Sequence, residues 1–198
     1  MPLSSVMIEK GAVIAHDNAA LARQELRSSF EARLDGMVQR RLAVAPHALI
    51  PNRHFAGAST ECIDTFEEGH FIACVTLVQA VAEGIAKFVC LRTATRSGKD
   101  QNARVQRLFN AKVISAECVR AFHSISGMQR DDFHHMNPEV PTDWRVLETL
   151  AKKALNDLSV VEREIFAFQF EAGRLVPKHP QYWDATPKGT VSVFLRGR

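Results

Sequence analysis

The chain has 198 residues, with 25 Lys and Arg against 22 Asp and Glu, which gives a formal net charge of +3. Hydrophobic residues make up 46% and charged residues 24% of the sequence, so the composition excludes a disordered, collagen-like or low-complexity protein. At roughly 150 residues per domain, this length favours one domain that buries a full core without metal or disulfide staples.

The cysteines and the N-terminus favour a cytoplasmic protein. The four cysteines form no CxxC pair, and three of them fall inside apolar helical patterns, which is typical of reduced, buried thiols. No basic region followed by a long apolar core begins the sequence, so a secretory signal is not predicted. The most hydrophobic stretch, Phe71 to Leu91, carries Gln79, Glu83 and Lys87 at four-residue intervals. We therefore expect a buried helix with one polar stripe there, and no membrane span.

Helical periodicity dominates the first half of the chain. His16–Asn18 offers an N-cap for a charged amphipathic helix whose apolar positions run from Leu21 to Leu42. Prolines and a glycine between Pro46 and Thr60 predict a loop. The following Phe71–Leu91 segment is apolar on most sides, which predicts the central helix of a bundle.

The second half predicts two further main helices and a tail. Ser115 is expected to start a helix whose apolar face continues to Met136 and ends before Pro138. Asp143 opens a long final helix with an apolar seam from Leu147 to Phe168. The tail beyond it is rich in proline and aromatic residues, and residues 191–194 predict a short strand.

These elements predict an all-α protein, an antiparallel up-and-down helical bundle with a short irregular C-terminal tail. We expect residues 1–60 to hold an N-terminal helix and loop, 61–175 the bundle, and 176–198 a tail packed on it. Tyr182 and Trp183 are more often packing residues than a platform for bases.

One cluster of chemistry-bearing residues stands out near the end of the third main helix, Arg130-Asp131-Asp132-Phe133-His134-His135. Arginine clamps a phosphate in bidentate fashion, and histidine gives or takes a proton near neutral pH. A neighbouring carboxylate can hold an imidazole in one tautomer. These groups suffice to cleave RNA without a metal, because a base activates the 2′-hydroxyl, a cation stabilises the phosphorane and an acid protonates the leaving oxygen.

On one continuous helix these groups divide into two stripes. At 100° per residue, Arg130 lies with His134, and Asp131 lies with His135. Both stripes face one cleft only if the helix end loosens before Pro138, or if a second copy of the chain contributes.

Here the sequence resembles the HEPN superfamily of nucleotide-binding domains. Arg130-Asp131-x-x-x-His135 is similar to its R-polar-xxx-H motif, and the helix GHFIACVTLVQAVAEGIAKF precedes it in the expected order. The likeness covers about residues 65–170. It implies a helical bundle that often dimerises, with the motifs of two chains meeting at the interface. Many members are metal-independent endoribonucleases of toxin–antitoxin and antiviral systems, and others are non-catalytic binding modules.

The resemblance implies catalytic roles for Arg130, Asp131 and His135. His134 is an additional imidazole to which the motif assigns no role, and we expect it to assist. Many members have Asn where this chain has Asp131. The expected partners are RNA, a second copy of the chain in a homodimer, and an antitoxin or other partner protein, with no cofactor, no metal and no membrane.

Other interpretations stay open. The cluster could be a solvated helix C-terminus, where histidines meet the negative end of the helix dipole. Asp131, Asp132, His134 and His135 could also form a metal site, although ligands usually come from separate elements. A non-catalytic module that associates through the Leu147–Phe168 seam is the alternative function. P-loop, Rossmann, zincin and α/β-hydrolase motifs do not occur in the sequence.

Overall fold

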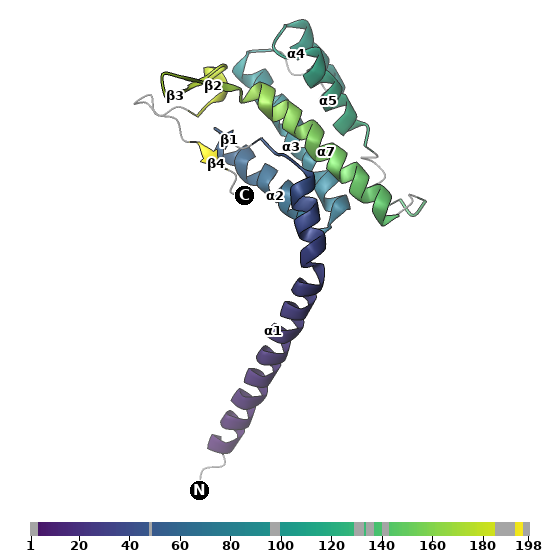
Figure 1. Ribbon diagram of the computed structural model, residues 1–198, viewed down its shortest axis with the longest axis vertical. Coiled ribbons are helices and arrows are strands. Elements are labelled where there is room, and N and C mark those ends of the chain that lie inside the picture. Colours follow the sequence, from purple (N-terminus) through teal and green to yellow (C-terminus); the bar gives the residue numbers. More distant parts are fainter. Residues whose placement is uncertain are drawn as a thin grey trace. The chain divides into compact units, whose positions relative to one another are not determined.

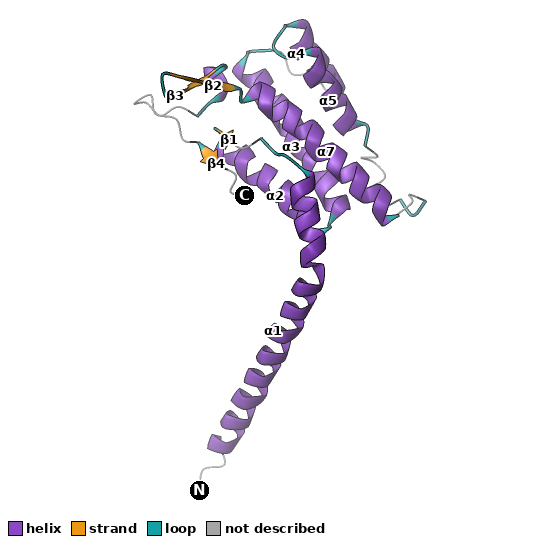
Figure 2. Cartoon of the chain, in the orientation of Figure 1, coloured by secondary structure: helices purple, strands orange, loops and turns teal. Residues whose placement is uncertain are grey.

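The computed structural model describes residues 4–47, 49–95, 100–128, 133, 137–139, 143–184 and 193–195. It is mostly helical, with only short strands (Figures 1 and 2), so the predicted all-α class is confirmed. The chain divides into two compact units, residues 1–39 and 40–198.

The first unit is formed by α1 (Ser4–Ala43), whose last residues belong to the second unit. Arg40 and Arg41 in its last turn match the negative end of the helix dipole. The helix runs through His16–Asn18, so the N-cap expected there is wrong. Alanine-rich sequence on both sides of this tripeptide favours continued helix, and a cap has no helix start to satisfy.

The second unit begins its bundle with α2 (Arg53–Glu68), in a segment that we expected to be largely a loop. That expectation is wrong because Asn52 is an effective N-cap. Its Oδ1 accepts hydrogen bonds from the backbone N–H groups of His54 and Phe55 at 3.1 and 3.2 Å. Gly69 ends the helix in the left-handed region, at φ 87°.

At the centre of the second unit lies α3 (Phe71–Arg92), as the sequence predicts. It contacts α2, α4 (Gln101–Asn110), α5 (Ala116–Ser126) and α7 (Trp144–Ile165), and eleven of its side chains are buried. By length and hydropathy alone this helix could cross a membrane, but half of its most apolar window is buried inside the protein. Figure 1 shows α7, in green, running past α3 and α5.

The polar stripe that we expected on α3 is partly wrong. Glu83 and Lys87 form an ion pair at 2.8 Å, as residues four apart on a helix often do. Gln79 is instead buried, with 6% of its surface exposed, and it faces another helix.

The start of α5 follows the prediction and its end does not. Ser115 caps the helix, since its Oγ accepts from the N–H of Cys118 at 3.2 Å. The helix ends at Ser126, about ten residues before Met136, and Gly127 follows it. Glycine is a poor helix former and is common at helix ends. The apolar periodicity beyond Gly127 nevertheless suggested that the helix continues.

The last helix, α7, begins at the predicted cap, because Oδ1 of Asp143 accepts from the N–H of Arg145 at 2.8 Å. It ends at Ile165, so the expected helical seam up to Phe168 is wrong at its far end. The chain continues into β2 (Phe168–Glu171), which pairs with β3 (Arg174–Pro177). Ala172 and Gly173 join the two strands with φ values of 48° and 77°, as a tight hairpin requires.

Two aromatic residues of the described part of the tail belong to the hydrophobic core. Tyr182 and Trp183 are 2% and 3% exposed, at the end of the short helix η1 (Pro180–Tyr182). Farther along, β4 (Phe194–Leu195) pairs antiparallel with β1 (Leu49–Ile50). Residues 191 and 192 of the expected strand lie outside the described part of the chain.

Candidate functional site

The residues of the predicted catalytic motif lie between α5 and α7. Arg130, Asp131, His134 and His135 are outside the described residues, and so is Asp132 of the alternative metal site. Because α5 ends at Ser126, the division into two stripes on one unbroken helix no longer follows from the fold. The structure does show how the chain enters and leaves this segment.

Two buried side chains hold the chain on either side of Arg130. Met128 and Phe133 are each 5% exposed and belong to the hydrophobic core. Only four residues, 129–132, lie between them in the sequence, so the motif's arginine and first aspartate belong to a short segment with a buried residue on each side.

A buried amide from α3 fixes the end of α5. Nε2 of Gln79 donates hydrogen bonds to the backbone oxygens of Ile125 at 3.1 Å and Met128 at 3.0 Å. The Ile125 carbonyl also accepts from the N–H of Met128 at 3.3 Å, so the amide adds a second hydrogen bond there and supplies a donor to the Met128 carbonyl, which lies just beyond the helix. Oε1 of Gln79 is buried and has no hydrogen-bond partner among the residues that the structure describes.

An open apolar depression lies where α7 begins, a few residues after the motif. It has a volume of about 540 Å³ and is lined by Gly69–Ala73, Trp144 and Leu147. Trp144 is 51% exposed, and its ring centroid lies 4.5 Å from that of Phe71. An exposed indole over a shallow apolar floor can hold a planar ring, including a nucleic-acid base.

A cation packs against the two aromatic rings of the depression. The Arg40 guanidinium lies 5.8 Å from the Trp144 ring and 5.9 Å from the Phe71 ring, while its Nε donates to the backbone oxygen of Glu67 at 2.8 Å. A side chain at Gly69 would approach Trp144 within 3.1 Å and would be strained at its positive φ. The Arg40 guanidinium therefore packs against the indole, and the absence of a side chain at Gly69 leaves room for it.

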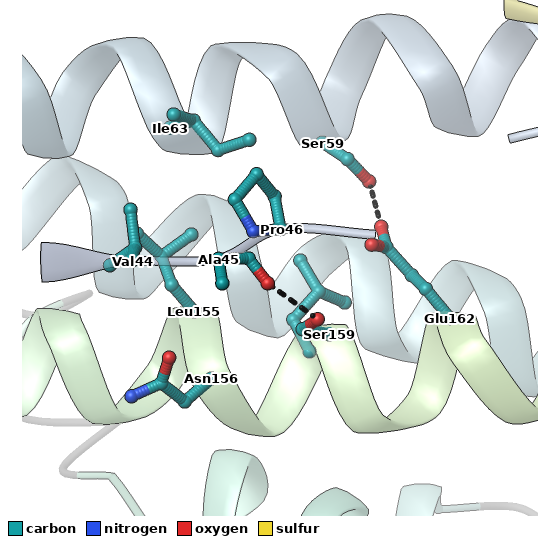
Figure 3. A pocket seen from close by; sticks show the side chains of 10 residues that line it. Val44, Ala45, Pro46, Ser59, Ile63, Leu155, Asn156, Ser159 and Glu162 are labelled. Carbon is teal, nitrogen blue, oxygen red and sulfur yellow. Dashed lines mark hydrogen bonds between the residues drawn. The ribbon is translucent and has the colours of Figure 1, made fainter. Parts of the chain in front are cut away.

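A second cavity, shown in Figure 3, lies between α2, α7 and the chain before β1. Ser59 donates to the Glu162 carboxylate at 2.5 Å, and Oγ of Ser159 donates to the backbone oxygen of Ala45 at 3.2 Å. The cavity volume of about 10 Å³ has room for about one water molecule. With Glu162 only 1% exposed, these polar groups join elements of the core and leave no space for a substrate.

The cysteines and the described histidine of α5 add no reactive group. All four cysteines are buried, as expected. Burial raises the pKa of the Cys74 thiol to about 12 and also raises that of Cys118, so both stay protonated at neutral pH. His123 is exposed, and its Nδ1 lies 3.1 Å from Oδ1 of Asn102.

Metal-binding groups do not gather in the described part of the chain, where no cluster of three or more His, Cys, Asp or Glu could hold an ion. The sequence did not point to the Trp144 depression or to Gln79. Each depends on segments far apart in the chain, and only the exposed tryptophan directly after an N-cap could have been noticed. Comparison with protein-family models, with curated proteins and with solved structures found no match for this chain.

Proposed function

We propose that this protein is a metal-independent endoribonuclease of the HEPN type, built on an antiparallel helical bundle and acting in the cytoplasm, in a toxin–antitoxin or defence role. The observation that carries the proposal is the Arg130-Asp131-x-x-x-His135 sequence next to a buried, two-sided anchor. A cation, a carboxylate and an imidazole on such a segment are the groups that the reaction needs.

In this mechanism the 2′-hydroxyl of the RNA attacks the adjacent phosphorus. Arg130 binds the scissile phosphate and stabilises the negative charge that builds on it. His135 acts as general base or acid, Asp131 orients its ring, and His134 assists. The P–O5′ bond breaks, the leaving oxygen takes a proton, and the products carry a 2′,3′-cyclic phosphate and a 5′-hydroxyl.

Two described features support this proposal. The hydrogen bonds from Gln79 hold the chain two residues before Arg130, which lowers the cost of orienting the motif. The Trp144 depression offers an aromatic surface for a flanking base, nine positions after His135 in the sequence.

The test is RNA cleavage by the purified protein in EDTA. We expect Arg130→Ala and His135→Ala each to lose about 10²–10⁴-fold in rate. Matched controls come from α5, where exposed Arg120 and His123 provide the same substitutions outside the motif. Equal activity of wild type and both motif variants would contradict the assignment, and so would equal losses in the controls.

The second candidate is a non-catalytic helical module that binds a partner protein or a second copy. The Leu147–Phe168 seam, which motivated it, is largely used within the chain, because Leu147, Ala151, Ala154 and Leu158 are all buried. A different observation favours it, the exposed apolar side chains of α1. A protein inert on diverse RNAs that co-purifies stoichiometrically with another protein would support this candidate.

A further inference from the structure

A row of large apolar side chains follows α1 at four-residue intervals and lies open to solvent. Leu26, Phe30, Leu34 and Val38 are 72%, 46%, 41% and 44% exposed. Every residue from 18 to 36 is exposed. Helices in proteins draw most of their stability from the packing of an apolar face, so a helix with such a row is better stabilised by a partner. We call these four residues the α1 row.

The charges around the α1 row are arranged antisymmetrically about Ser29. The six charged residues within six positions of Ser29 are Arg23, Glu25, Arg27, Glu31, Arg33 and Asp35. Each charged residue before Ser29 has a residue of opposite charge at the same distance after it. The pairs are Arg23 with Asp35, Glu25 with Arg33, and Arg27 with Glu31. Two copies of α1 laid antiparallel about Ser29 therefore place each of these charges at the level of an opposite charge. An in-register parallel pair would place like charges at every level, which is unfavourable.

The same register interleaves the apolar side chains. When the helices run antiparallel about Ser29, Leu26 of the second copy lies opposite Ala32 and its Phe30 lies opposite Ser28. At a rise of 1.5 Å per residue, large side chains from the two copies then alternate about every 3 Å along the contact. Large residues thus meet small ones across the axis.

The spacing also predicts the crossing of the two helices. Rows of residues four apart interdigitate when helix axes cross at about −50°. The contact is then centred on the two-fold axis at Ser29, with Phe30 of each copy one residue away from it, and Arg27 and Glu31 are the charges closest to that axis. At 100° per residue both lie on the same flank of the row, which is where antiparallel helices bring side chains together.

We propose that the α1 row binds the same row of a second copy of this chain, antiparallel about Ser29. The charge pattern selects the two-fold axis at Ser29, and the large apolar side chains interleave about the same axis. This self-association does not depend on the ribonuclease proposal, and it places a dimer contact on α1, outside the bundle.

The sharpest test mixes two complementary charge reversals in the full-length chain. Arg27→Glu alone faces Glu31 of its copy with a like charge, and Glu31→Arg alone faces Arg27 in the same way. Each variant is expected to raise the dimer dissociation constant on the order of tenfold in analytical ultracentrifugation. An equimolar mixture restores both pairs in the heterodimer, so we expect the wild-type dissociation constant there. Within each chain residues 27 and 31 still repel, so a recovery can arise only between chains.

Two further variants complete the test. Phe30→Ala should raise the dissociation constant on the order of 100-fold, because the aromatic ring lies at the centre of the contact. Lys152→Glu reverses an exposed charge on α7 and should leave it unchanged. Circular dichroism checks that each variant keeps its helix content. A wild-type chain that stays monomeric, a dimer insensitive to Phe30→Ala, or a mixture as weak as its two components would each overturn the proposal.

Discussion

Helices α3 and α1 show that large apolar side chains can have different roles on different helices. In α3 the apolar side chains contact four other helices, and the buried Gln79 finds its partners on α5. On α1 the four apolar side chains of the α1 row lie exposed, with charged residues between them in the sequence. The apolar side chains of α3 are buried by the folding of their own chain. Those of the α1 row would be buried by association with another molecule, which makes α1 a binding surface.

The comparison can be tested with identical substitutions in the two regions. Both tryptophans of the chain, Trp144 and Trp183, lie in the second unit, so their fluorescence during urea unfolding follows the bundle. All the following unfolding measurements are made at concentrations where the chain is monomeric, so that any association through α1 does not contribute.

The largest difference is expected between two phenylalanines. Phe66→Ala removes a fully buried ring from α2 and should lower the free energy of unfolding by about 3–5 kcal/mol. Phe30→Ala removes a half-exposed ring from α1 and should change it by less than about 0.5 kcal/mol. Similar losses for the two variants would show that α1 shares the core of the bundle, and would remove the distinction between the regions.

A smaller difference is expected between two glutamines. Gln79→Leu removes the side-chain donor to the Met128 carbonyl and one of two donors to the Ile125 carbonyl, and should cost about 1–3 kcal/mol, while Gln24→Leu on α1 should cost little. Because Gln79 holds the chain before Arg130, hydrogen exchange at Gly127 and Met128 should also accelerate. Unchanged exchange there would mean that the end of α5 is held by other contacts.

Two serines sharpen the comparison further. Ser59→Ala removes a hydrogen bond to the buried Glu162 carboxylate and should lower the free energy of unfolding by about 2 kcal/mol. Ser28→Ala, on the exposed surface of α1, should have an effect within about 0.5 kcal/mol. A negligible loss for Ser59→Ala would indicate that water replaces the hydroxyl in the small cavity beside it.

The smallest effects are expected for two asparagines, whose substitutions by alanine should act in opposite directions. Asn52 caps α2, so Asn52→Ala should cost about 1 kcal/mol. Asn18 lies inside α1, where alanine is the better helix former, so Asn18→Ala should raise the helix content slightly in circular dichroism. Loss of helix content in Asn18→Ala would instead support the N-cap that the sequence suggested at this position.

Much of the bundle could be predicted because its signals are local. The α3 segment is apolar on most sides, and Ser115 and Asp143 are oxygen-bearing caps directly before periodic segments. The prediction of a loop before Thr60 was wrong because Pro51 and Gly57 were given more weight than the N-cap residue Asn52. Gly57 lies in open space, so no close approach requires it there, and α2 accommodates it.

The sequence predicts which residues the candidate site contains, but not the contacts that hold its segment. Arg130 and His135 are visible in the sequence, but the contact that anchors their segment joins Gln79 to residues 46 and 49 positions away. Helical periodicity beyond Ser126 suggested a continuous helix, and no local pattern distinguishes that from an α5 that ends at Ser126. The hairpin after α7 was missed for a similar reason, because Phe168 matches both the helical seam and a strand of alternating residues.

The central claim is tested most directly by the products formed from matched RNA and DNA oligonucleotides in EDTA. The account predicts that only the RNA is cut, that its fragments end in a 2′,3′-cyclic phosphate, and that one 2′-deoxy nucleotide at the cleavage site blocks the cut. Cleavage of the DNA strand, RNA fragments with 5′-phosphate ends, or activity that appears only with a divalent metal would contradict it.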